Sequence, residues 1–446
     1  MRMGIDKRKF SWGMVLSLAL LGFSMSTGWA INKGLTFKLL QEGYTNAPAV
    51  IGAVLSLQGL MGLIVPPLMG YYSDVYSSGR GRRTPFVLAG GILAGLIALA
   101  IYLGYVARMS LAAFAVILAA FYFFMYFFVA QYRSLMPDVV ESGARGKVSG
   151  IITLFEWMGN LFLFGMIAFL AVKASAVTGV SDEIKAMSEA GYLWIPFAVV
   201  AIFLIGSAIY VFFRVKEPKI KGEMPEESLW DYFRTILSDR DFLSFYIAQM
   251  LWWLSFEFIA VFMFGILESV LGTSSVTALG NAIMALFNVT VLIGAITGGP
   301  LYDRIGRRKS IIIGGVLFLI PLLLGWFIHT KLQVTALIGF AGIGWGMLMA
   351  TSWPVIGDLL TKYEKEAFNG RYYGFFEATK SFPILIAGLV GGGIVQLAGG
   401  NYKILFPVGA IFVLIALPLI WGMKHLDVMS NEKPGIDKIE DTQEGV

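Results

Sequence analysis

Long apolar runs recur along the chain, each near the about 20 residues that an α-helix needs to cross a bilayer. Hydrophobic residues fill 57% of the 446 positions and charged residues only 14%, against roughly 45–50% and 25% in soluble domains. The sequence therefore predicts an all-α polytopic membrane protein with twelve transmembrane helices. The runs lie near residues 11–40, 47–72, 86–107, 110–132, 148–172, 191–214, 242–267, 275–301, 310–329, 332–356, 372–397 and 402–424.

The twelve runs fall into two sets of six, separated by a polar stretch from Lys216 to Asp241 that is rich in Lys, Glu and Pro. This stretch contains apolar residues at helical spacing, which is typical of a helix lying on the membrane surface: Leu229, Trp230, Phe233, Ile236 and Leu237. We therefore expect four parts: an N-terminal six-helix bundle (1–215), a cytoplasmic linker with an interfacial helix (216–241), a C-terminal six-helix bundle (242–425) and a cytoplasmic tail (426–446).

Basic residues concentrate in the segments on the side of the predicted membrane that carries both termini. Because Lys and Arg are enriched in cytoplasmic loops, we expect an integral protein of the plasma or cytoplasmic membrane with both termini in the cytoplasm. The first apolar run is too long for a secretory signal, so we interpret it as the first span.

Composition also narrows the chemistry. The chain has no cysteine and only two histidines, His329 and His425, which excludes thiolate metal sites and leaves little for histidine chemistry. A net charge of +5 is explained by the cytoplasmic loops and does not indicate a nucleic-acid partner. We expect the partners to be the lipid bilayer and a small-molecule solute, with no metal, no cofactor and a monomeric chain.

A charged turn occurs twice, at corresponding places in the two sets of spans. Gly70-x-x-x-Asp74 is followed by Gly81-Arg82-Arg83, and Gly299-x-x-x-Asp303 is followed by Gly306-Arg307-Arg308. A second pair joins Pro137-Asp138 with Arg145 and Gly357-Asp358 with Gly370-Arg371. Such duplication is expected of parallel six-helix repeats, although each cluster alone is also explained as a positive-inside topology anchor. The charged members are Asp74, Arg82, Arg83, Asp138, Arg145, Asp303, Arg307, Asp358 and Arg371.

With these clusters the sequence resembles the major facilitator superfamily over essentially its whole length. The resemblance implies a fold of two six-helix bundles, alternating access, and a cytoplasmic gate built from the nine charged residues just named. The stretch from Pro66 to Asp74, six residues, and then Gly81-Arg82-Arg83-Thr84-Pro85-Phe86 is more narrowly similar to the glycoside–cation symporters, especially the sucrose–proton symporter branch.

Charged residues inside the predicted spans are functional candidates, because each costs at least about 2.5–3.5 kcal/mol in the bilayer. Arg133 matches the cavity arginine of the resembled branch; alternatively it is a gate residue paired with Asp138. Glu156 lies in span 5 with Asn160 one turn away, and we expect it to be buried without a permanent cation and to carry the proton, unless it is a structural hydrogen-bonding group.

Other candidates lie in spans 7 and 11. Glu257 shares a helix face with Gln249 and Trp253, an arrangement suited to a sugar-like solute, although Glu257 is equally compatible with the exposed outer mouth. Glu377 and Lys380 are three apart: they are a structural pair, or they recognise a charged group, or Lys380 is a switchable partner of Glu156.

Further polar residues are expected to support this site: Asn32, Lys33, Gln58, Asn281 and Asn288. Lys33 is also compatible with the outer surface, where we expect Lys38 and Glu42. The resembled branch carries an aspartate in span 4 where this chain has Tyr122, and an asparagine where it has Glu377. These departures weaken the expectation of a neutral disaccharide and of coupling through span 4.

The favoured hypothesis is a secondary transporter that moves a sugar or glycoside by symport with protons, sodium being the alternative ion. The second hypothesis keeps the fold but moves a charged or amphipathic organic solute, including by export. A non-transporting receptor is a third. The sequence contains no nucleophile–base set and no phosphate-binding loop, so an enzyme is not expected.

Overall fold

The computed structural model describes residues 11–75, 78, 81–140, 145–217, 234, 237–272, 276–363, 369–423 and 426. Within this part of the chain, twelve helical stretches are long and apolar enough to cross a membrane, which confirms the predicted all-α, twelve-span fold. Most of the predicted interfacial helix and most of the tail lie outside the described residues.

The first six spans form the N-terminal bundle. Its first span consists of α1 (Trp12–Ile31), the π-helical segment η1 (Asn32–Thr36) and α2 (Phe37–Gly43). The remaining helices are α3 (Pro48–Val75), α4 (Thr84–Val106), α5 (Leu111–Val139), α6 (Arg145–Thr178), the short connecting helix α7 (Glu183–Glu189) and α8 (Trp194–Arg214).

The second six spans form the C-terminal bundle. They comprise α10 (Arg240–Ala260) with α11 (Met263–Leu271), α12 (Val276–Ile305), α13 (Arg307–Leu324) and α14 (Lys331–Lys362), followed by α15 (Asn369–Ile386) with η5 (Ala387–Gly391) and α16 (Gly392–Leu397), and α17 (Leu405–Gly422). Thus the regular α-helical geometry of α1 breaks after 20 residues, where the π-helical segment continues the helix, and α10 ends after 21 residues. The first span of each bundle therefore departs from a regular α-helix after a similar length.

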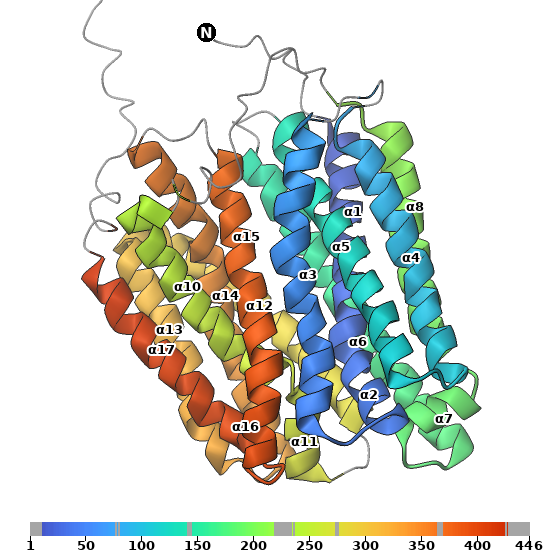
Figure 1. Cartoon of the computed structure of the whole chain (residues 1–446). Helices are drawn as coiled ribbons and strands as arrows, with labels where there is room; N and C mark the ends of the chain where they lie inside the picture. Colours follow the sequence, from blue (N-terminus) through green and yellow to red (C-terminus); the bar gives the residue numbers. More distant parts are fainter. Residues whose placement is uncertain are drawn as a thin grey trace, which may run out of the picture.

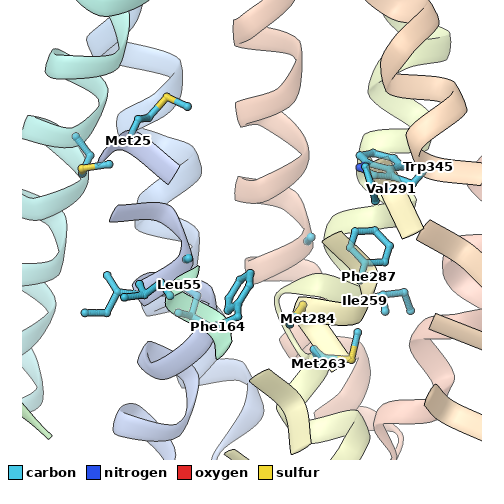
Figure 2. Packing of buried hydrophobic residues seen from close by; sticks show 14 of the residues in the cluster. Met25, Leu55, Phe164, Ile259, Met263, Met284, Phe287, Val291 and Trp345 are labelled. Carbon is cyan, nitrogen blue, oxygen red and sulfur yellow. The ribbon is translucent and has the colours of Figure 1, made fainter. Parts of the chain in front are cut away.

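Each bundle has its own packed core. In the N-terminal bundle α1 packs on α6 and α8, and α4 packs on α5 and α8; in the C-terminal bundle α12 packs on α14, and α10 on α15 and α17. Figure 2 shows buried apolar side chains of both cores, with Met25 and Leu55 in one and Phe287 and Trp345 in the other. Contacts of α6 with α12 and of α3 with α15 join the bundles.

The two ends of the molecule differ in which ends of the helices they carry. The termini side is the end where α1 begins and α17 ends, and the far side carries α2, α7, α11 and α16 (Figure 1). Polar and charged side chains are gathered on the termini side, in the middle of the bundles and along the far-side contact between them.

Candidate functional site

A network of charges holds the termini side of the N-terminal bundle. The guanidinium of Arg82 donates to both oxygens of Asp138, at 3.0 Å from Nε and 2.8 Å from Nη2. Arg83 Nε lies 3.3 Å from the same carboxylate, and Arg83 Nη1 donates to the hydroxyl of Ser73. Two arginines from the loop before α4 are therefore tied to the end of α5 by charge-assisted hydrogen bonds.

Glu217, which the sequence did not single out, completes this network. Its carboxylate accepts from the backbone N–H groups of Arg82, Arg83 and Thr84, at 2.5–2.9 Å, and from the Thr84 hydroxyl. These N–H groups lie at the start of α4 and have no partner inside the helix, so Glu217 caps α4. The negative charge of its carboxylate also interacts favourably with the positive end of the helix dipole. The segment that follows α8 is thereby bound to the charged turn.

The C-terminal bundle repeats the pairing. Arg307 at the start of α13 forms an ion pair with Asp358 near the end of α14, as Arg82 does with Asp138. Arg308 donates to the Trp421 carbonyl oxygen at 2.9 Å. The other four charged residues of the repeat lie on described backbone, but their side chains are outside the described set: Asp74, Arg145, Asp303 and Arg371.

Arg133 and Glu156 form an ion pair within the N-terminal bundle. Arg133 Nη1 lies 2.8 Å from Glu156 Oε1 and Nη2 lies 3.2 Å from Oε2, while the Tyr132 hydroxyl donates to Oε1 at 2.9 Å. The expectation that Glu156 is buried without a permanent cation is therefore wrong. The alternative that Arg133 is paired with Asp138 is replaced by this pair, which leaves the Arg133 side chain 34% exposed. Asn160 is half-buried one turn along α6.

A chain of hydrogen bonds occupies the level of the break in α1. The Tyr122 hydroxyl donates to Asn32 Oδ1 at 2.6 Å, and Asn32 Nδ2 donates to Gln58 Oε1 at 2.8 Å. All three side chains are buried. Tyr122 thus stands where the resembled branch has an aspartate and provides a neutral hydroxyl that bonds to the π-helical segment.

An ion pair joins the two bundles at the same level. Lys33 Nζ in η1 lies 3.1 Å from Glu257 Oε1 in α10 and 4.9 Å from the centre of the Phe256 ring. The Lys33 side chain is 26% exposed and that of Glu257 only 2%. The alternative that Glu257 is exposed at the outer mouth is therefore wrong, because α1 covers it when the far side is closed.

Further contacts close the far side. Lys38 pairs with Glu42 in its own bundle at 3.2 Å and lies 3.8 Å from Glu268 of the other bundle, where Gln41 also donates at 2.6 Å. The expectation that Lys38 and Glu42 lie on the outer surface is wrong, since their side chains are only 6% and 13% exposed; apposition of the bundles buries them.

Glu183 in α7 adds an inter-bundle cap that the sequence did not reveal. Its carboxylate accepts from the backbone N–H groups of Thr277 and Ala278, which begin α12 in the other bundle. Burial raises the pKa of Glu183, and these backbone donors oppose that rise. The cap places a carboxylate at the positive end of a 30-residue helix.

The helices α3 and α15–α16 meet on the far side through glycines. A Cβ added at Gly52 would lie 2.1 Å from the Gly388 carbonyl oxygen, and one at Gly392 would lie 2.5 Å from that of Pro48. Only backbone fits between these helices, so the far side is closed by direct helix contact as well as by charge.

Aromatic rings of the C-terminal bundle lie next to Lys33 and Lys380. Trp253 lies edge-on to Trp345 with 4.8 Å between ring centres, and Phe256 stacks on Trp345 at 4.2 Å. Lys380 Nζ lies 5.6 Å from the Trp253 ring and 4.7 Å from that of Phe376. The side chain of Glu377 is outside the described set, so the predicted pair with Lys380 is not described.

Several predicted binding residues instead tie helices together. Gln249 donates to the Phe376 carbonyl oxygen and to the Thr379 hydroxyl, and it is fully buried between α10 and α15. Asn281 donates to the Gly34 carbonyl oxygen across the bundles, whereas Asn288 donates to that of Met284 in its own helix. Of the face predicted on span 7, Trp253 and Glu257 remain near the middle of the molecule.

A small apolar cavity of about 50 Å³ lies among the helices of the C-terminal bundle. Its walls come from α10 to α14 and α17 and are apolar apart from Lys33 at one edge. Figure 2 shows Ile259, Met263, Met284 and Phe287 from this wall close together. The cavity offers room for an apolar group beside the inter-bundle ion pair, but few polar partners for a sugar.

The chain matches a family of known proteins. The family described as MFS/sugar transport protein matches residues 40–401. Among relatives, the multidrug transporter protein MdtP of Bacillus subtilis is 26% identical over 40% of this chain and 34% of its own length. The sucrose transport protein SUC4 of Arabidopsis thaliana is 36% identical over 19% of this chain and 17% of its own. The match thus spans about a third or less of these relatives.

Solved structures share the fold. A bacterial homologue of the human lysosomal transporter Spinster, in an inward-facing and unoccupied conformation, gives a TM-score of 0.72 at 14% identity over 96% of this chain and all of that one. The nucleoside transporter NupG gives 0.67 at 14% identity over 92% and 98%. At these identities the likeness concerns the fold alone.

Proposed function

Since the chain belongs to the MFS/sugar transport protein family and is therefore a membrane transporter rather than an enzyme, we propose that it moves a sugar or glycoside in symport with protons. Alternating access is the proposed mechanism, with the termini side facing the cytoplasm because basic residues concentrate there. The proposed substrate class rests on the family match over residues 40–401, and the local likeness to a sucrose transporter supports it.

The arrangement of ion pairs supports alternating access. The pairs of Arg82 with Asp138, Arg307 with Asp358 and Arg133 with Glu156 lie within one bundle, so they persist when the bundles rotate as units. The contacts of Lys33, Lys38 and Glu183 cross between bundles on the far side. A rotation that opens the far side breaks this second group and leaves the first group intact.

The middle of the molecule offers groups suited to a sugar. Arg133 is held by both oxygens of Glu156 and keeps a third of its side chain exposed, so its planar, positively charged guanidinium is presented in a fixed orientation. The buried Trp253 ring nitrogen has no hydrogen-bond partner among the described residues, and the ring itself provides an apolar face for a sugar.

Uptake into proteoliposomes tests this proposal. Labelled sucrose should accumulate faster with an inward proton gradient than without one, and Arg133→Lys should reduce uptake because a lysine cannot reproduce the two-point contact with Glu156. Equal uptake with and without the gradient would refute proton coupling. Absence of uptake for sucrose and for simple glycosides would refute the substrate class.

A second candidate is transport of an amphipathic organic solute. The apolar cavity beside Lys33 and the local likeness to a multidrug transporter favour it. A thermal-shift screen separates the two, because a ligand at 100 times its Kd stabilises by about 2.7 kcal/mol. Stabilisation by amphipathic organic ions and by none of the sugars would select this second function.

A further inference from the structure

The protein contains two buried carboxylate–cation pairs near its middle, and they differ in how transport would treat them. Glu156 and its partners Arg133 and Tyr132 all belong to the N-terminal bundle. Glu257 belongs to the C-terminal bundle, whereas its partner Lys33 belongs to the N-terminal one. Rotation of rigid bundles leaves the first pair intact and pulls the second apart.

Glu257 depends on Lys33 for its charge balance. Lys33 is the one ion-pair or hydrogen-bond partner of its carboxylate among the described side chains, and Glu257 is 1% exposed. Its neighbours in sequence, Phe256, Phe258 and Ile259, are apolar. Departure of the Lys33 ammonium removes the attraction that favours the charged carboxylate, so proton uptake by Glu257 is more favourable in the open state than in the closed state.

Other charged groups on the surrounding elements are engaged elsewhere. Lys380 on α15 lies over the rings of Trp253 and Phe376, and Glu268 on α11 binds Lys38 and Gln41. Glu183 on α7 caps α12. The remaining described charges are either paired or near helix ends. Asp241 is bound to Tyr363, Asp358 to Arg307, Glu42 to Lys38 and Glu189 to Lys185. Arg240, Arg304 and Lys331 lie near helix ends, and the side chains of Asp303, Lys362, Arg371 and Glu377 are not described.

We infer that the pair between Lys33 and Glu257 is the proton-coupling device of this transporter. When the far side opens, Lys33 leaves with α1, and the carboxylate of Glu257 binds one proton from the far-side solvent. When the far side closes, the Lys33 ammonium returns, Glu257 becomes a carboxylate again, and that proton leaves to the solvent. The Lys33 side chain is 26% exposed although the far side is closed, so the ion pair is not sealed off in the closed state.

This inference rests on the proposed proton-coupled transport and transfers the coupling role from Glu156 to Glu257. It explains why the loss of an aspartate at the position of Tyr122 is compatible with coupling. It also gives the break in α1 a use, since π-helical segments often lie at functional sites and this one holds Lys33 against the other bundle.

Proteoliposomes that contain the full chain allow coupling to be measured separately from transport. The readouts are proton-driven accumulation of labelled sucrose and its exchange without a gradient. Glu257→Gln imitates the protonated state but leaves Lys33 unpaired in the closed state, so Lys33→Met with Glu257→Gln is the decisive double variant. This double variant should retain exchange, and its proton-driven accumulation should fall at least tenfold.

An inter-bundle pair outside the proposed device provides the matched control. Lys38→Met with Glu268→Gln removes one cation and one carboxylate from the far-side contact and should keep the wild-type ratio of accumulation to exchange. Proton-driven accumulation by the double variant at Lys33 and Glu257, or an equal loss of the ratio in the double variant at Lys38 and Glu268, would overturn the inference. If the wild type shows neither exchange nor accumulation of any sugar, the proposed substrate class fails instead.

A measurement without substrate keeps the inference testable in that case. Spin labels at Ser188→Cys in α7 and Ser269→Cys in α11, both exposed, report the distance between the bundles on the far side. In a Glu183→Gln background, which removes the carboxylate that caps α12 across this interface, the closed fraction should rise with pH because closing releases a proton from Glu257. The same rise after the double change at Lys33 and Glu257 would refute the inference.

Discussion

Enlarging Gly52 should open the far side. An added Cβ would lie 2.1 Å from the Gly388 carbonyl oxygen, whereas a carbon and an oxygen in contact are about 3.3 Å apart. Gly52→Ala therefore requires α3 and α15–α16 to separate by about 1 Å. Overpacking of this kind costs about 1–3 kcal/mol, which changes the ratio of closed to open molecules by about 5-fold to 150-fold.

The chain is well suited to measuring that shift, because it contains no cysteine. A single Thr277→Cys change places a thiol at a position that is 0% exposed in the far-side contact. Its rate of reaction with a bulky hydrophilic maleimide in detergent reports how often the contact opens. We expect Gly52→Ala to raise this rate at least fivefold.

Gly393→Ala is the matched control. Gly393 lies in α16 beside the tightly packed Gly392, but no atom lies within 4 Å of its added Cβ. Both changes raise helix propensity equally, so only the clash differs. An unchanged rate for Gly52→Ala, or an equal increase for Gly393→Ala, would refute the conclusion that direct glycine packing holds the far side closed.

Three further predictions concern stability. Asp138→Asn should lower the free energy of unfolding by about 1–3 kcal/mol, because two arginines lose a shared carboxylate; a thermal melt equal to wild type would contradict this. Glu217→Gln should cost about 0.5–2 kcal/mol, the usual value of a helix cap, measured in the same way, and no loss would show that α4 does not need its cap. The hydrogen bond to the Asp241 carboxylate, with burial, raises the pKa of Tyr363 from 10.0 to about 12. Its contribution is therefore complete below pH 10 and lost as the pH rises through 12; Tyr363→Phe should remove that part of the pH dependence of the melting temperature, and an unaltered profile would contradict it.

Much of the fold was predictable because a bilayer span needs only local information, namely about 20 apolar residues in succession. Twelve spans follow from that requirement alone. The matched turns at Arg82 and Arg307 were visible for a related reason, since each combines glycine and basic residues within a few positions of the chain.

The partners within the site were less accessible to sequence reasoning. Glu156 was expected to lack a cation, yet Arg133 is 23 residues away and on the next helix. Glu183 and Glu217 act as caps on helices 94 and 133 residues distant, and nothing in their local sequence identifies the receiving helix. Lys38 and Glu42 looked like surface charges because burial by the opposite bundle is a property of the assembled fold.

The short segments at the far end of the first span of each bundle bear on how the far side responds to an external binder. α2 has seven residues and α11 has nine, and Gln41 of α2 donates to Glu268 of α11. An antibody fragment that binds α2 and α11 together would therefore hold this contact and keep the far side closed.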